Sequence, residues 1–462
     1  MTDTNLTPER AVAQLVVDFN ASQIDAKSLA MTKAMIKDQF AIQLGASQLP
    51  WSKQVRVARQ LRPGKSTIVA DSEKVAAADA AYINASYGHG FEYDDFAGNA
   101  HPGCTVVPVA FALGEELGLT LGEVVVAMVA GFEAYVRIGN IGSPGFLNNG
   151  WQPHSVLSNF GSAAIAAKLY GLNVEQTQHA LAIALSHASG TTEYASSGGS
   201  IKRVHAGIGA RNGIESADLA RAGITGPRNY LTGHRGLYQN FIHQTLDPKA
   251  YEIFRPDHPL MIAGINFKPY CCCACTHPFI DLMANVRGRA QDVVEIDASI
   301  QTMVNSIVGT SNKSIYQPNN IEEVQYSLPV QMAMSALGMG NGYTAHRDIL
   351  NGKTSLAPDS EVIGFAKKVK IAIDTDLDRK YPLVFSGNVG VKFKDGSRED
   401  YFISGAKGTP ANPFTPEEHR IKLDDLCFEV IGEQQAVKLY NLVDRLSSDM
   451  KVAEVTRLLS KQ

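Results

Sequence analysis

Histidines and carboxylates crowd one short stretch of the chain, which reads His-Gly-Phe-Glu-Tyr-Asp-Asp-Phe-Ala-Gly-Asn-Ala-His-Pro-Gly from His89 to Gly103. Two imidazoles and three carboxylates lie within it: His89, His101, Glu92, Asp94 and Asp95. Imidazole and carboxylate are the usual general acids and bases near neutral pH. The stretch therefore predicts a loop that moves protons, with Gly and Pro fixing an irregular backbone that aims these groups.

The adjacent pair Asp94-Asp95 is not expected to aim both carboxylates into one pocket, because successive side chains of an extended backbone point to opposite sides. One carboxylate would face the pocket, while the other would cap a helix or orient a partner. For either carboxylate alone, capping at a helix start explains the residue as well as catalysis does. For the loop as a whole, a functional role is the better explanation.

A second candidate group is the segment Gly-Trp-Gln-Pro-His-Ser at 150–155, which precedes a helix of small residues. His154 and Ser155 are expected near the amino terminus of that helix, where N–H groups and the helix dipole favour bound anions. An equally supported interpretation makes Ser155 the N-cap and His154 a surface histidine.

A third candidate group is a Ser- and Gly-rich turn at 196–201 that leads to Lys202, Arg203 and His205. Such a turn with a following lysine can hold a carboxylate or a phosphate, but the spacing of a P-loop is absent. The alternative is a solvated basic turn, which the two consecutive glycines make less favoured.

A fourth candidate group runs from Lys268 to His277 and contains Cys271, Cys272, Cys273 and Cys275. The Cys-x-x-Cys spacing suits a metal, but a structural zinc site needs a second pair and none follows nearby. An iron–sulfur cluster would need Cys104 or Cys427 to fold close to it. Buried thiols at a tight interface are the favoured interpretation.

Composition excludes several classes of protein. The chain has 462 residues, of which 45% are hydrophobic and 19% charged, and its formal net charge is −4. It is therefore long enough for two or more domains, and its negative net charge does not favour binding to nucleic acid. The first ten residues lack the features of a signal peptide, and the most apolar run, at 124–136, is interrupted by Glu133 and too short to span a bilayer. We expect a soluble cytoplasmic protein without a membrane partner.

Mostly helical patterns surround these candidate residues. Long apolar segments with Gly-rich breaks predict helices up to about residue 265, including one that begins with a capping box at Thr120 and one capped by Asn173. Alternating residues at 293–300 and 369–374, and a hairpin pattern around Asp395-Gly396, predict strands. Helix is expected again at 322–338, after Thr415 and from 433 to 459.

We therefore predict a mainly α protein made of two parts. A large all-helical domain would take residues 1–265 and 412–462. A smaller α+β domain would take residues 266–411 and would be inserted into the helical one.

Together the four groups resemble the MmgE/PrpD family, whose members include 2-methylcitrate dehydratases, cis-aconitate decarboxylases and iminodisuccinate epimerases. The resemblance covers nearly the whole chain. It is carried by Asp94-Asp95 with His101-Pro-Gly, by the small-residue helix Phe160–Leu172, by Lys202-Arg-Val-His-Ala-Gly with Ala222–Pro227, and by Lys268-Pro-Tyr and Tyr326-Ser-Leu-Pro. It implies an inserted α+β lid, a homodimer built through the helical domain, and action on small di- or tricarboxylates without a metal or organic cofactor.

The sequence departs from the family pattern at several positions. The family loop often reads Asp-Phe-Asp-Asp-Thr, where this chain has Glu92-Tyr-Asp-Asp-Phe96. The family's Gly-Phe-His-Pro-Thr is Gly-Trp-Gln-Pro-His here, so the usual histidine position is Gln152. An expected tyrosine in the lid is Val330. Because Gln does not exchange protons as imidazole does, the reaction of other members does not transfer directly.

Our hypothesis is a cofactor-independent lyase, most readily a dehydratase, that removes a proton α to a carboxylate in a site between the helical and lid domains. Catalytic roles are assigned to Asp94, Asp95, His101, His154 and Lys202. Substrate-binding roles are assigned to Lys268, Arg203, Gln152, Glu92 and His277. Open alternatives are an epimerase or decarboxylase of the same family, an iron–sulfur hydratase, and a family member that binds carboxylates without turnover.

Overall fold

A computed structural model describes residues 7–98, 100–197, 199–380 and 385–461. The chain divides into two compact units, each of which is described by itself. The first takes Met1–Gly90, Asp94–Ile265 and Leu426–Gln462, and the second takes Phe91–Tyr93 and Asn266–Asp425. The predicted mainly α fold with a small α+β part is confirmed.

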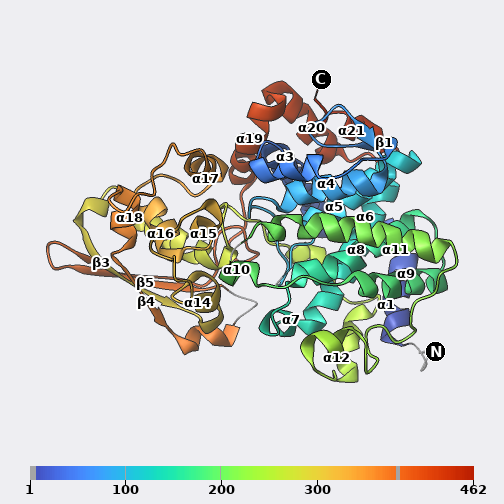
Figure 1. The fold of residues 1–462 in the computed structure, drawn as a ribbon, viewed down its shortest axis with the longest axis horizontal. Helices are drawn as coiled ribbons and strands as arrows, with labels where there is room; N and C mark the ends of the chain where they lie inside the picture. Colours follow the sequence, from blue (N-terminus) through green and yellow to red (C-terminus); the bar gives the residue numbers. More distant parts are fainter. Residues whose placement is uncertain (1–6, 99, 198, 381–384, 462) are drawn as a thin grey trace. The chain divides into compact units, whose positions relative to one another are not determined.

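The first unit is helical. Its helices are α1 (Pro8–Asp18), α2 (Ala26–Ala46), α3 (Pro50–Val57), α4 (Ala77–His89), α5 (Gly103–Leu117), α6 (Leu121–Gly142), α7 (Gly145–Asn148), α8 (Pro153–Leu169), α9 (Val174–His187), α10 (Tyr194–Ser197), α11 (His205–Arg221), α12 (Leu237–Ile242), α20 (Glu433–Arg445) and α21 (Val452–Thr456). Short 3-10 turns are η1 (Ala21–Gln23), η2 (Ile201–Val204), η3 (Pro248–Phe254) and η4 (Met261–Gly264), and β1 (Pro63–Thr67) pairs antiparallel with β2 (Lys74–Val75). Helices α4, α5, α6, α8 and α11 run side by side in Figure 1.

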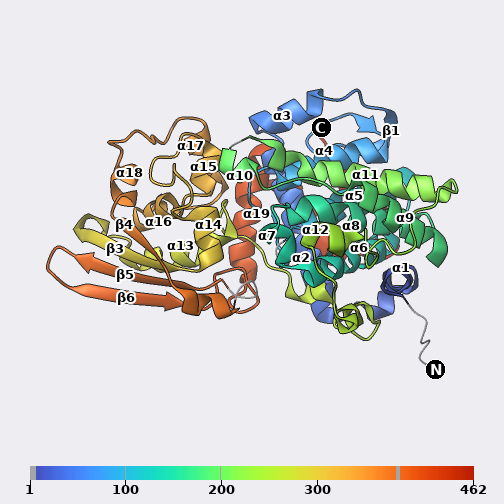
Figure 2. The same ribbon diagram turned by 60° about the horizontal axis from the view of Figure 1, so that its bottom comes forward.

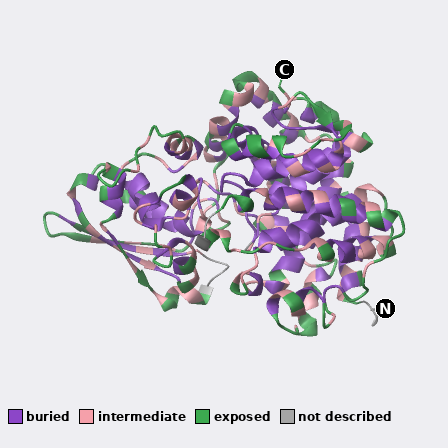
Figure 3. Cartoon of the chain, viewed as in Figure 1, coloured by how far each residue is buried: buried purple, intermediate pink, exposed green. Residues whose placement is uncertain are grey.

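Helix α8 lies at the centre of this unit, where it packs against α5, α6, α9 and α11. Small residues allow this close approach. A Cβ built on Gly209 of α11 would come within 1.9 Å of the Ser158 hydroxyl, and one on Gly213 within 2.2 Å of the Ser162 side chain. The buried stretch of α8 is continuous in Figure 3, as the all-round apolar pattern predicted.

Helix α6 begins with the predicted capping box, in which Thr120 and Glu123 satisfy each other's backbone N–H. With 22 residues it is long and apolar enough to cross a membrane, so the prediction that this run is too short was wrong. The most apolar stretch of α6 is 83% buried inside the protein, which identifies α6 as a helix of the core. A core helix can be as long and as apolar as a helix that spans a membrane.

The second unit combines a sheet with helices. Its strands are β3 (Val293–Ile300), β4 (Val369–Ile373), β5 (Gly387–Phe393) and β6 (Arg398–Ile403), in the order β4-β3-β5-β6. Its helices are α13 (His277–Met283), α14 (Thr302–Val308), α15 (Ile321–Gln325), α16 (Leu328–Ala336), α17 (Tyr343–Leu350), α18 (Glu361–Ala366) and most of α19 (Pro416–Ile431), with 3-10 turns η5 (Ala274–Thr276), η6 (Ala284–Val286), η7 (Ala290–Asp292) and η8 (Thr375–Lys380).

The sheet has one buried and one charged face. Strand β3 pairs parallel with β4 and antiparallel with β5, so that Ala298 lies opposite Val389 on the buried side. On the other face, Glu295 of β3 forms ion pairs with Lys370 and Lys392. Helix α13 packs on β5 and β6, as Figure 2 shows.

Two predicted helices are broken. The segment 322–338 forms α15 and α16, because Ser327 caps a new helix whose first turn contains Pro329. The tail from 433 to 459 forms α20 and α21, separated where Leu446 adopts a positive φ of 40°.

Candidate active site

The stretch between α4 and α5 brings acidic and basic groups of the helical unit together. His89 is the last residue of α4, His101 lies two residues before α5, and His154 lies in the first turn of α8. The ring centroid of His89 lies 5.2 Å from that of His101 and 4.5 Å from that of His154. Three imidazoles that are distant in sequence therefore form one cluster around Asp94, and we name these four residues the histidine cluster.

Asp94 orients two of the imidazoles. Its Oδ2 lies 2.7 Å from Nδ1 of His89 and 3.4 Å from Nδ1 of His101, and its side chain is fully buried. Nδ1 of His101 also lies 3.0 Å from the carbonyl oxygen of Asp95, which can only accept a hydrogen bond. Nδ1 of His101 therefore carries the proton, and Nε2 is the basic nitrogen of the neutral ring.

The carboxylate of Asp95 makes different contacts from that of Asp94. Its Oδ2 accepts from the backbone N–H of Gly103 at 2.9 Å, and its Oδ1 accepts from the amide of Gln39 at 3.1 Å. A Cβ on Gly103 would lie 2.0 Å from Oδ1, so only glycine permits this approach. Burial and the neighbouring Asp94 raise the pKa of Asp95 to about 7. The expectation that only one carboxylate of the pair faces the imidazoles agrees with these contacts.

His154 is a buried neutral histidine. Its Nδ1 lies 2.7 Å from the hydroxyl of Tyr135 on α6, and its Nε2 lies 3.7 Å from Sγ of Cys104 on α5. Burial, followed by the nearby His89 and His101, holds the pKa of His154 well below its usual value. The interpretation of His154 as a surface residue was wrong, because its side chain packs inside the unit.

The basic turn places its two cations in different surroundings. The guanidinium of Arg203 donates to the carbonyl of Gly90 and stacks over the ring of Trp51 at 3.7 Å. Lys202 is buried, and the pKa of His205 is lowered to about 4 by burial, by His89 and by Lys202, in that order. The two cations are therefore not solvated, whereas Gly199, Ser200 and Ile201 of the turn before them are exposed. Of residues 196–201, Gly198 and the side chains of Ser196 and Ser197 lie outside the described residues.

Gln152 is the residue before α8. Its backbone N–H donates to the carbonyl of Gly190, and its side-chain amide donates to the hydroxyl of Tyr194 at 2.9 Å. The ring of Tyr194 lies 6.1 Å from that of His205. Gln152 thus belongs to a polar group with Tyr194 and His205.

The remaining sequence candidates lie in the second unit. Nζ of Lys268, which is 1% exposed, donates to the carbonyl of Glu92 at 3.1 Å and lies 3.4 Å from its carboxylate. Glu92 has a positive φ of 58°, an unusual conformation for a residue with a side chain. His277 begins α13 and contacts the carbonyl of Cys272, and burial holds its pKa well below the usual value.

Metal-ligating atoms gather in the helical unit rather than at the cysteines. Among the described residues, two groups of three could hold an ion, His89 with Cys104 and His154, and His89 with Asp94 and His101. The cysteines at 271–275 form no such group within the same described ranges. Their thiols contact ordinary partners, such as Sγ of Cys272 with the Thr276 hydroxyl at 3.1 Å. The thiol geometry gives the iron–sulfur alternative no support.

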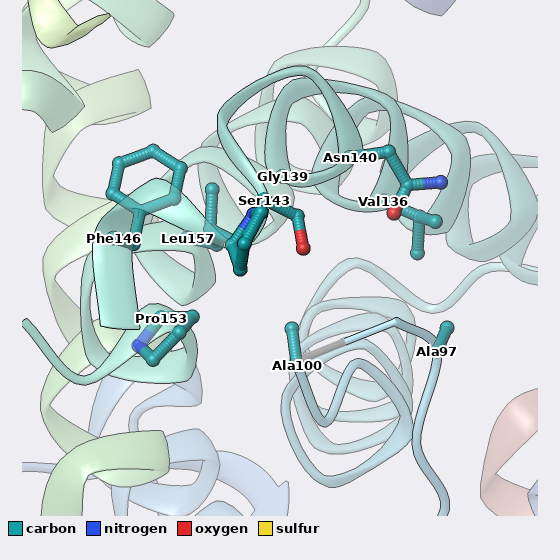
Figure 4. Close-up of a pocket in the computed structure, with 10 residues that line it drawn as sticks. Ala97, Ala100, Val136, Gly139, Asn140, Ser143, Phe146, Pro153 and Leu157 are labelled. Carbon is teal, nitrogen blue, oxygen red and sulfur yellow. The ribbon is translucent and has the colours of Figure 1, made fainter. Parts of the chain in front are cut away.

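A small cavity adjoins the loop beyond the histidine cluster. Figure 4 shows Ala97 and Ala100 facing Val136 and Asn140 of α6 across it, with Pro153 on another side. Its volume of about 10 Å³ accommodates about one water molecule and no organic ligand. A hollow of about 360 Å³ between α1 and η3 is not lined by any of the candidate residues.

Sequence reasoning missed Tyr135, Cys104, Gln39 and a role for His89 beyond membership of the loop. Tyr135 and Cys104 lie inside continuous apolar helices, where no pattern distinguishes them from core residues. His205 was noted only as the end of the basic turn. Its position two residues after Arg203 at a helix start was the available signal.

Comparison with known proteins agrees with this picture. The model of the MmgE/PrpD N-terminal domain matches residues 10–249, and that of the MmgE/PrpD C-terminal domain matches residues 270–447. A cis-aconitate decarboxylase of Aspergillus terreus is 26% identical over 94% of this chain and 92% of its own length. A cis-aconitate decarboxylase-like protein of Aspergillus oryzae is 26% identical over 100% of this chain and 99% of its own length, and the cis-aconitate decarboxylase of Mus musculus is 25% identical over 82% and 78%. The two domain models together span most of the sequence, and the chain belongs to the MmgE/PrpD family.

Proposed function

We propose that this MmgE/PrpD enzyme is a lyase that acts on a small di- or tricarboxylate and uses His101 to transfer a proton, without a metal or organic cofactor. The observation that carries the proposal is the contact of Asp94 with Nδ1 of His101. The carbonyl of Asp95, which accepts the Nδ1 proton at 3.0 Å, fixes the tautomer of His101, and the adjacent carboxylate of Asp94 raises the basicity of the other ring nitrogen. Nε2 of His101 is then the atom that exchanges protons with substrate.

The same pair can serve either lyase reaction. In decarboxylation, the bond between the α-carbon and a carboxylate breaks, carbon dioxide leaves, and the electron pair is held as an enolate-like anion until the imidazolium of His101 protonates it. In dehydration, Nε2 of His101 removes the proton α to a carboxylate, the electron pair forms the carbon–carbon double bond, and the hydroxyl on the next carbon takes that proton back from the imidazolium and leaves as water. Both reactions need cations beside the carboxylates of the substrate.

Lys202 is the proposed cation of the helical unit. It is buried, and its ammonium is close enough to His205 to lower the pKa of that histidine. Lys268 is proposed as a second cation from its match to the family motif. Arg203 is better explained as a structural residue, because Gly90 and Trp51 occupy its guanidinium.

The other candidates receive different roles from their contacts. Asp94 is proposed to orient the imidazoles, while Asp95 is proposed to hold the loop through Gly103 and Gln39. His154 does not fit the role of proton donor to a leaving hydroxyl, because its low pKa keeps it neutral at pH 7.

Decarboxylation of cis-aconitate is the first reaction to test, because the relatives with which the chain aligns over most of its length are cis-aconitate decarboxylases or similar proteins. The sequence alone favoured dehydration, which remains the second candidate because His101 is equally placed for it. Purified enzyme would be incubated in deuterated water with cis-aconitate or with a panel of hydroxy-di- and tricarboxylates, and products followed by NMR. Decarboxylation gives carbon dioxide and an unsaturated dicarboxylate with one solvent deuteron, whereas dehydration gives an alkene and no carbon dioxide.

The His101→Gln variant tests the assigned residue. Loss of the proton-transfer group is expected to lower kcat by about 10²- to 10⁴-fold. The matched control is His234→Gln, which changes an exposed histidine of the same unit. Full activity of His101→Gln would overturn the proposal, and binding of carboxylates without turnover of any panel member by the wild type would identify a non-catalytic family member.

A further inference from the structure

We propose that His89, Cys104 and His154 form a binding site for a divalent transition-metal ion of the zinc type, which inhibits the enzyme. The three side chains come from α4, α5 and α8, and one ligand atom of each lies within 4.8 Å of the others. All three side chains are buried. Imidazole nitrogen and thiolate sulfur are the ligands that zinc prefers, and three protein ligands leave a fourth position for water or substrate.

The separation between two of the ligand atoms suits a metal. Nε2 of His154 lies 3.7 Å from Sγ of Cys104. Bonds of about 2.0 Å to nitrogen and 2.3 Å to sulfur at a tetrahedral angle place such atoms about 3.5 Å apart. These two side chains therefore need almost no movement to share one ion.

The groups behind the ligands are those of a metal centre. Metal-bound histidines almost always engage their second ring nitrogen with a carboxylate or another polar group, which fixes the ring. Asp94 holds Nδ1 of His89 at 2.7 Å, and the hydroxyl of Tyr135 holds Nδ1 of His154 at 2.7 Å. Each imidazole thus directs Nε2 to the metal with its outer partner already in place.

Chemistry also favours this group over the overlapping one of His89, Asp94 and His101. In that group Nδ1 of His101 carries a proton that it donates to the carbonyl of Asp95 at 3.0 Å, so binding would break this bond and change the tautomer. In the proposed group the step is an exchange at sulfur. The S–H bond of Cys104, which donates to the carbonyl oxygen of His101 at 3.2 Å, breaks, the electron pair forms the metal–sulfur bond, and the proton leaves to solvent. This contact is lost, but both histidines bind as neutral imidazoles without a change of tautomer.

The form in which Cys104 binds sets how the site responds to pH. Zinc binds the thiolate, so the buried thiol of Cys104 must lose its proton when the cation binds. Binding is therefore expected to release a proton, to weaken as pH falls and to develop slowly. Inhibition follows because an ion on His89 disturbs Asp94, which orients His101. Only this last step rests on the proposed function.

The test uses Co²⁺ as a spectroscopic probe and Zn²⁺ as its competitor on the purified full-length protein freed of metal. We expect about one Co²⁺ per chain, a thiolate-to-cobalt charge-transfer band in the near ultraviolet, and loss of the band on addition of Zn²⁺. Cys104→Ser is expected to lose the band. Asp94→Asn is expected to weaken binding by about 10- to 100-fold. The control Cys427→Ser, which changes another buried thiol of the same unit, should retain both.

Circular dichroism of each variant excludes loss of fold. No Co²⁺ bound to the folded wild type at equilibrium would overturn the site, as would a charge-transfer band that survives in Cys104→Ser. Bound Co²⁺ without a sulfur band would assign the ion to Asp94 and His101 instead and would equally overturn the proposal. Stoichiometric binding of Zn²⁺ without loss of turnover would leave the site standing and contradict the role given to His101.

Discussion

Protonation of Asp95 is coupled to the stability of the helical unit, and replacing this residue with Asn isolates the coupling. Burial, followed by repulsion from Asp94, raises its pKa from 3.8 to about 7. The hydrogen bonds from Gly103 and Gln39 oppose that rise without cancelling it. An Asn side chain has the same shape, keeps an acceptor for the N–H of Gly103 and cannot ionise. The Asp95→Asn variant is therefore a reference that does not titrate at this position.

The direction follows from proton linkage. Because the pKa is higher in the folded chain, the folded state binds more protons at Asp95 than the unfolded state between about pH 4 and pH 7. Relative to Asp95→Asn, the wild type is therefore most stable below about pH 4. It loses stability as pH rises through this range and shows no further change above it. The difference between 3.8 and about 7 corresponds to about 4 kcal/mol.

Tryptophan fluorescence suits the measurement, because both tryptophans of the chain, Trp51 and Trp151, belong to the helical unit. Urea unfolding of the wild type and of Asp95→Asn would be followed at several pH values between about 4 and 8. As pH rises across this range, the free energy of unfolding of Asp95→Asn minus that of the wild type should increase by several kcal/mol. Asp25→Asn is a control that should track the wild type across this range, since hydrogen bonds from Ser28 lower the pKa of Asp25 in the fold and its titration lies below about pH 4. Parallel stability curves for the wild type and Asp95→Asn would refute the reasoning.

Three further substitutions test other contacts. Gly103→Ala should lower the urea midpoint and disturb the loop, because the new Cβ would lie 2.0 Å from Oδ1 of Asp95, and an unchanged midpoint would contradict that approach. Arg137→Met should cost about 3–5 kcal/mol in unfolding free energy, because it leaves the fully buried carboxylate of Glu133 without its ion pair, and a cost below about 1 kcal/mol would count against it. Asp94→Asn should lower kcat by about 10²- to 10⁴-fold with little change in KM, since the imidazoles lose the charge that orients them, and steady-state kinetics showing a change in KM alone would argue for substrate binding instead.

The fold was predictable wherever one local pattern decided the structure. Strand β3 coincides with the alternating segment 293–300, because one face of the sheet is buried and the other carries charges. The hairpin turn coincides with Asp395-Gly396, where Gly396 has a positive φ of 85°. Patterns failed where two signals competed, as at Ser327, where a capping residue interrupts an otherwise continuous helical sequence.

The sequence predicted which loop carries the candidate site, but not which side chains of the site contact one another. The types of residue in the loop indicated proton transfer, yet nothing local indicates that Asp94 meets the imidazoles while Asp95 meets Gln39. Those partners lie on different helices, so their meeting depends on how α2, α4 and α5 pack. Arg203 shows the same limit, because the ring on which it stacks, Trp51, lies far away in the sequence.

The exchange of histidine between positions 152 and 154 is not a simple shift of one catalytic group. Gln152 is the N-cap of α8 and has an extended backbone, whereas His154 lies in the first turn of the helix, so the two side chains do not share one direction. Their contacts differ accordingly, since Gln152 meets Tyr194 whereas His154 meets Tyr135 and Cys104. His154 therefore does not take the place of Gln152 in the fold. In the reaction that we propose, the proton passes through His101, and the neutral amide of Gln152 serves binding, because it does not exchange protons as imidazole does.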